Sequence, residues 1–205
     1  MRTIATQELL RQLRTLPGII PVMPRREVAP FSALEGGIAR GSLVEFFGKP
    51  GCGKTELVLR FLAENPDLKG AWVEQNFSIY PPAFPQFQVE LDRILFVEAT
   101  PNPRATRAGS KAALWATHQI LKSQLFGAIV LTEVSIHETE LRRLQLASEK
   151  SQSIIFLLKD NPTQRRHWPI AIQAEVIRGE EGKIHILKSK GIRPCPPPDA
   201  SYVSA

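Results

Sequence analysis

Short apolar runs alternate with amphipathic stretches along most of the chain. Apolar runs predict buried strands, and apolar residues repeated at intervals of three and four predict helices. The predicted strands span residues 43–47, 71–74, 94–98, 128–131, 153–158, 171–178 and 183–188. The predicted helices span residues 7–16, 56–62, a short part of 81–92, 105–124 and 138–150. Strands that alternate with helices in this way predict a doubly wound α/β fold with a mostly parallel sheet.

The two ends of the chain differ from this central region. The helix predicted at 7–16 has an apolar face of leucines, and a proline-punctuated connector follows to residue 30. The last two predicted strands flank a glycine-containing turn and are expected to form an antiparallel hairpin at one edge of the sheet. We therefore expect an N-terminal helix and linker (1–30), a core (31–192) and a mobile, proline-rich tail (193–205).

A glycine-rich segment joins the first predicted strand of the core to the next helix. It fills every fixed position of the phosphate-binding pattern G-x-x-x-x-G-K-[ST]. Such a loop turns backbone N–H groups toward phosphate oxygens, and the helix N-terminus adds its positive end. Lys54 would reach the β- and γ-phosphates, and the Thr55 hydroxyl would bind Mg²⁺. The residues expected to contact nucleotide are Gly48, Lys49, Pro50, Gly51, Cys52, Gly53, Lys54, Thr55 and Glu56.

The predicted ligands are ATP and Mg²⁺, because the N-K-x-D motif by which GTPases recognise guanine is absent. The alternative is a glycine-rich turn that binds nothing. The net charge of +6 and the pI of about 9.6 shift the expectation modestly toward a polyanionic partner. Two cysteines far apart in sequence indicate neither a zinc site nor a disulfide framework. With no signal peptide and no long apolar run, we expect a cytoplasmic protein with no membrane contact.

A paired-glycine turn, Gly36-Gly37, precedes a short G-x-L-x-E strand that leads into the phosphate-binding loop. This entry to the loop resembles that of RecA-like recombinase ATPases. Residues 82–96 resemble the RecA segment in which a small helix, an acidic turn and a strand follow one another. Residues 183–190 resemble the basic strand that closes the RecA core. The resemblance covers about residues 31–194 and implies a RecA-like P-loop core.

The chain departs from the RecA pattern at the positions that serve hydrolysis. Where the family has an aspartate that positions Mg²⁺ through water, this chain has Thr132 followed by Glu133. Glu133 would substitute only with a one-residue register shift, which turns a side chain to the other face of the sheet. Asn76 aligns with the acidic residue that activates water, and an amide accepts no proton at neutral pH. Glu74 is the other catalytic candidate, and a local capping role for it is an equal alternative.

The segments that bind DNA in RecA are reduced here. Residues 134–138 leave almost no room for the first DNA loop, and the second is at most residues 160–169. Arg165, Arg166 and Trp168 in that stretch suit phosphate contact and base stacking on single-stranded DNA. The alternative is a solvated turn in which Trp168 packs on the edge hairpin.

A RecA-like core with shortened DNA segments resembles the ImuA group of bacterial accessory proteins in damage-induced translesion synthesis. That resemblance implies a Y-family polymerase-like protein or a RecA-type protein as partner. Three functions follow: a nucleotide-switched accessory protein with weak or absent hydrolysis, an active DNA-stimulated ATPase of recombination type, or a nucleotide-independent interaction module. The helix predicted at 7–16 would dock on another protein, on a second copy or on its own core, because so short a helix is marginal alone.

Overall fold

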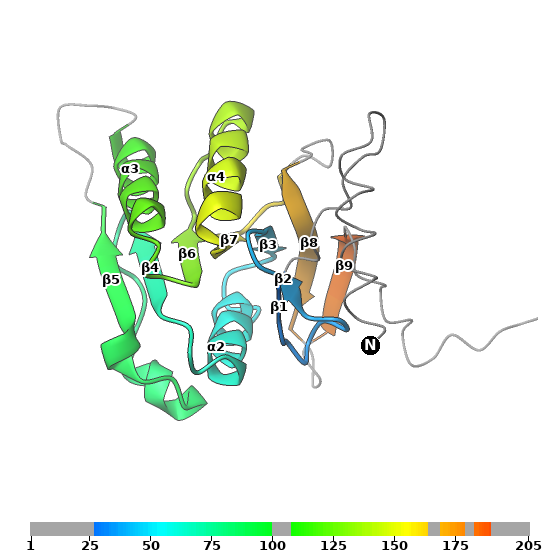
Figure 1. The fold of residues 1–205 in the computed structure, drawn as a ribbon. Helices are drawn as coiled ribbons and strands as arrows, with labels where there is room; N and C mark the ends of the chain where they lie inside the picture. The colour runs from blue at the N-terminus through cyan, green and yellow to red at the C-terminus, as the bar shows by residue number, and fades with distance from the viewer. Residues whose placement is uncertain (1–26, 100–107, 164–168, 179–182, 190–205) are drawn as a thin grey trace, which may run out of the picture.

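The computed structural model describes residues 27–99, 108–163, 169–178 and 183–189 (Figure 1). The strands are β1 (Val28–Ala29), β2 (Ile38–Ala39), β3 (Leu43–Phe47), β4 (Gly70–Glu74), β5 (Ile94–Glu98), β6 (Ala128–Thr132), β7 (Ile154–Lys159), β8 (Ile170–Ile177) and β9 (Lys183–Ser189). The helices are α2 (Lys54–Glu64), α3 (Ala108–Ser123) and α4 (Glu138–Ser151), with 3₁₀ turns η1 (Pro81–Phe87) and η2 (Leu91–Arg93).

Seven strands form one sheet in the order β5-β4-β6-β7-β3-β8-β9. All neighbouring pairs are parallel except β8 and β9, which form the antiparallel hairpin at the edge. Figure 1 shows α3 and α4 over one face of the sheet and α2 with η1 over the other. The expected α/β fold, with a mostly parallel sheet and an edge hairpin, is confirmed.

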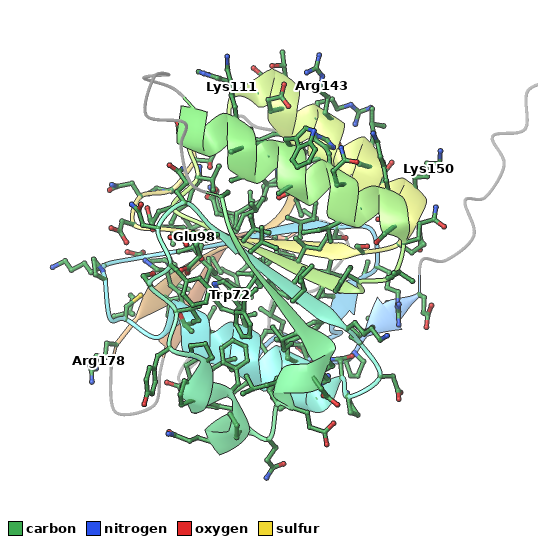
Figure 2. All side chains as sticks on the ribbon, turned by 90° about the vertical axis from the view of Figure 1, so that its left-hand side faces the viewer. Trp72, Glu98, Lys111, Arg143, Lys150 and Arg178 are labelled. Carbon is green, nitrogen blue, oxygen red and sulfur yellow. The ribbon has the colours of Figure 1, made fainter. Side chains whose placement is uncertain are left out.

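Two apolar cores hold these layers together. One lies between the sheet and α2, where Trp72 of β4 packs edge-on against Phe84 of η1 with ring centroids 5.7 Å apart (Figure 2). The other lies between the sheet and the pair α3 and α4. Because β3, β6 and β7 are covered on both faces, they are apolar almost throughout, as central parallel strands require.

The segment predicted to hold one short helix near residues 81–92 contains two 3₁₀ turns instead. Pro85 inside η1 has no N–H to continue an α-helical ladder, and Gln88 ends the turn in the left-handed region with φ of 61°. The end of the predicted connector forms β1, which pairs antiparallel with β2. The predicted helix at 7–16, the turn at 179–182 and the tail at 193–205 lie outside the described residues.

Candidate nucleotide site

The phosphate-binding loop leaves the sheet at the end of β3, between β7 and β8. The N–H of Gly48 donates to the carbonyl oxygen of Lys159 (3.1 Å), which fixes the start of the loop against β7. Gly48 has φ of 148°, and a Cβ there would lie 2.5 Å from the carbonyl oxygen of Val176. Gly51 has φ of 76°, and a Cβ there would meet no atom within 4 Å. The loop is therefore held tightly at its base and has open space at Gly51.

Helix α2 begins directly after the loop, with Gly53 as its N-cap and no side-chain cap. The first helical hydrogen bond runs from the N–H of Leu57 to the carbonyl oxygen of Gly53 (3.0 Å). The N–H groups of Lys54, Thr55 and Glu56 precede it and have no acceptor inside the helix. With the positive end of the helix dipole, these donors suit a phosphate group.

Lys54 lies in the first turn of α2 and contacts two acceptors from different parts of the chain. Its Nζ donates to the carbonyl oxygen of Gly48 (2.5 Å) and to Oδ1 of Asp160 (2.8 Å). The Lys54 side chain is 10% exposed and that of Asp160 41% exposed. The ammonium group is thus enclosed by the loop and bonded to an anion.

Glu133, the first residue after β6, lies close to Asp160. Partial burial raises the pKa of the Glu133 carboxyl, and the negative charge of Asp160 and a hydrogen bond to it raise that pKa further. Lys54 and Lys159 act in the opposite direction. The backbone of Glu133 has a left-handed φ of 49°, and its N–H donates to the carbonyl oxygen of Leu158 (2.9 Å). Glu133, Asp160 and Lys54 therefore form one charged cluster beside the loop.

Glu74 occupies a different environment from the one a catalytic base needs. It is buried at the end of β4, where the indole N–H of Trp72 (2.9 Å) and the N–H groups of Ser78 (2.6 Å) and Ile79 (3.1 Å) donate to it. The Ser78 hydroxyl adds a fourth donor at 3.2 Å. These contacts favour the local capping role over the catalytic one.

The other two positions of the hydrolytic pattern lie beside Glu74. Thr132 pairs in register with Glu74 across the β4–β6 ladder. Its Oγ1 is buried and has no hydrogen-bond partner within the described part of the chain. Asn76 lies two residues after β4, in an exposed bend. The carboxyl ends of β4 and β6 thus offer an exposed amide and a neutral hydroxyl at the two positions predicted from the sequence to align with carboxylates of the RecA pattern.

Two acidic residues have contacts that the sequence did not reveal. Glu45, inside the apolar run of β3, is buried and accepts hydrogen bonds from the N–H and hydroxyl of Thr163 and from Nε2 of Gln173. The sequence signal for the contacts of Glu45 was the presence of a charged residue inside an apolar run. For Asp160 the signal was its place at the carboxyl end of a central strand, where ligands of open α/β sheets bind. Arg165, Arg166 and Trp168 lie outside the described residues.

Comparison with known proteins finds a similarity to RecA. Over 156 residues the chain is 26% identical to "Protein RecA" from Caldanaerobacter subterraneus subsp. tengcongensis, covering 64% of this chain and 45% of that protein. The chain thus matches less than half of the relative's length. No protein-family model matches the chain. Within the described residues, no helix has the length and apolar character that crossing a membrane requires. The similarity and the fold together support a RecA-like nucleotide-binding protein.

Proposed function

We propose that this protein is a RecA-like ATP-binding accessory or regulatory protein of bacterial DNA repair or damage tolerance, which hydrolyses ATP weakly or not at all. The observation that carries the proposal is an intact phosphate-binding loop at the centre of the sheet beside altered hydrolytic positions. The loop offers N–H donors without helical acceptors, and the Lys54 ammonium group is enclosed beside them. Asn76 and Thr132 provide no carboxylate where hydrolysis needs one.

The residues at the loop offer more groups to the phosphates of ATP than to Mg²⁺. The N–H groups at the start of α2 and the Lys54 ammonium would hold the phosphates, and the Thr55 hydroxyl would be the protein ligand of Mg²⁺. Thr132 Oγ1, which has no hydrogen-bond partner among the described residues, could hydrogen-bond a metal-bound water, but it adds no negative charge. Bound ATP would bring a phosphoanhydride bond to the site, and we expect the site to bind the nucleotide but to cleave this bond slowly or not at all.

The partners that suit this role come from the resemblance to RecA and ImuA-type proteins. They are a Y-family polymerase-like protein or a RecA-type protein in translesion synthesis during the SOS response. Single-stranded DNA is a further candidate ligand because of the basic charge and of Arg165, Arg166 and Trp168. Nucleotide occupancy would then control binding to a partner.

The proposal is tested by measuring ATP affinity with and without Mg²⁺ for the parent protein and for Lys54→Ala. Loss of a charge-assisted contact to phosphate is worth about 1.5–3 kcal/mol, so the variant should bind ATP about tenfold to a hundredfold more weakly. Lys111→Ala is the matched control, because Lys111 is exposed on the outer side of α3 (Figure 2). Equal ATP affinity for Lys54→Ala and the parent would rule out the site.

Turnover measurements distinguish the proposed function from its two alternatives. We expect ATP to bind with little turnover, both with and without single-stranded DNA. Brisk, DNA-stimulated turnover would favour an active recombination-type ATPase, and Glu74 and Glu133 would again be the catalytic candidates. Absence of ATP binding in the parent protein would favour a nucleotide-independent interaction module.

A further inference from the structure

Asp160 contacts the amino group that the proposed function assigns to the phosphates of ATP. Its Oδ1 lies 2.8 Å from Nζ of Lys54, although the two residues are 106 positions apart in the sequence. The carboxylate has the charge and the hydrogen-bonding capacity that a phosphate oxygen would offer to the same lysine. Lys54 therefore has an anionic partner supplied by the chain itself.

The backbone around Asp160 is fixed on both sides by hydrogen bonds of its neighbours. On one side, the carbonyl oxygen of Lys159 accepts the N–H of Gly48. On the other side, the N–H of Thr163 donates to the buried Glu45 (2.9 Å). The carbonyl oxygen of Thr163 accepts a hydrogen bond from Nε2 of Gln173 (2.8 Å). The segment that carries Asp160 is thus tied to β3 and β8 and to the base of the phosphate-binding loop.

The charges around Lys54 also act against an incoming triphosphate. Asp160 and Glu133 place two carboxyl groups beside one ammonium group. A nucleotide phosphate that approaches Lys54 competes with Asp160 for its ammonium group and then lies near both carboxyl groups. Binding therefore includes the cost of weakening an existing ion pair, which lowers the apparent affinity.

We propose that Asp160 is an affinity-determining residue of the nucleotide site, because its carboxylate competes with the phosphates for Lys54. This inference rests on the proposed ATP-binding function. It assigns to Asp160 a role separate from metal binding and from catalysis. Asp160 sets how readily the loop accepts ATP.

The test compares ATP affinity in the parent protein and in Asp160→Asn, which keeps the size of the side chain and removes its charge. We expect the dissociation constant of Mg²⁺–ATP to fall about three- to tenfold. The change is modest because a partly exposed ion pair is weak, and the substitution removes only the competition of Asp160 with the phosphates for Lys54. Asp92→Asn makes the same charge change in η2, which precedes β5 and so lies at the opposite end of the strands from the loop. That control should leave the affinity unchanged.

A second measurement examines the ion pair without nucleotide. The reactivity of Lys54 toward an amine-acylating reagent, followed by mass spectrometry, should rise in Asp160→Asn and stay at the parent level in Asp92→Asn. If the parent binds ATP and Asp160→Asn binds it equally or more weakly, Asp160 does not compete with the phosphates and the inference is wrong. If the parent itself binds no ATP, the proposed function fails, and the inference fails with it. Thermal unfolding of each variant checks that the fold is intact.

Discussion

At the scale of single residues, acidic side chains in similar sequence positions have different environments. Glu74 ends β4 and is buried among four hydrogen-bond donors. Glu133 follows β6 and is only partly buried, and it lies beside another carboxyl group. Asp160 follows β7 and is paired with Lys54. Position at a strand end therefore does not determine the role of a carboxylate, because the neighbouring strand and loop supply its partners.

The raised pKa of Glu133 predicts a pH-dependent effect of its removal. The folded protein binds this proton more tightly than the unfolded chain does. The free energy of unfolding therefore falls as pH rises from the pKa of Glu133 in the unfolded chain through its pKa in the folded protein. Above the folded pKa, the ionised carboxylate of Glu133 destabilises the fold by its full amount, and this loss is the penalty. Glu133→Gln removes the penalty and should unfold at a higher temperature than the parent at about pH 8, with a smaller advantage at about pH 4.

Thermal unfolding at the two pH values checks this expectation. Glu98→Gln, at the exposed end of β5, is the control for the loss of a negative charge, because β4 and β6 separate β5 from β7. An advantage of Glu133→Gln that is equal at both pH values would contradict the assigned cause.

At the scale of elements, the segment after β4 is fastened to the sheet by one side chain. Glu74 binds the N–H groups of Ser78 and Ile79 and so holds the chain between β4 and η1 against the strand end. Beneath it, the rings of Trp72, Phe84 and Phe96 pack edge-on and close the core on this side. The bend that carries Asn76 is therefore part of an ordered connection between the strand and η1.

Removing the Glu74 carboxylate should destabilise the protein strongly. Glu74→Ala leaves several buried donors without an acceptor, and we expect the free energy of unfolding to fall by about 2–4 kcal/mol. The neighbouring strand provides a matched control, because Glu98 pairs in register with Glu74 but is exposed. Glu98→Ala should change the stability by no more than about 0.5 kcal/mol. Urea denaturation measures both, and similar losses for the two variants would show that Glu74 is not an anchor.

At the scale of the whole molecule, the described residues build the two layers of core and the whole of the large sheet. Its two apolar clusters use residues from Ala29 to Val176, and every strand of the large sheet lies between β3 and β9. The predicted helix at 7–16, with Leu9, Leu10, Leu13 and Leu16, lies outside the described residues. Docking of that helix on a different protein or on a second copy stays a prediction, with packing on its own core as the alternative.

If the predicted helix is an interface, removal of residues 1–17 should leave a folded protein that binds ATP. We expect the truncated chain to keep its cooperative thermal unfolding and its ATP affinity, and to lose self-association or binding to its polymerase-complex partner. Thermal unfolding, ATP titration and sedimentation of both proteins measure these properties. Loss of the fold on truncation would instead show that the predicted helix packs on its own core.

The phosphate-binding loop and most strands and helices follow from local sequence alone, because each depends on residues only a few positions apart. Spacing of apolar residues predicted β5 and nearly all of β6 and α4, and the filled G-x-x-x-x-G-K-T pattern predicted the loop. The two 3₁₀ turns after β4 were missed because Pro85 breaks a pattern that otherwise reads as one helix.

The partners of the charged groups depend on the tertiary structure. Lys54 meets Asp160 across 106 positions, and Glu45 meets Thr163 across 118. Both contacts arise because the sheet places β7 and β8 on either side of β3, an order that no local period encodes. Strand order is determined by how helices cover the two faces of the whole sheet and by which crossovers are sterically allowed. The local sequence pattern therefore predicts where a phosphate could bind, and only the folded sheet determines that the carboxylate of Asp160 lies beside Lys54.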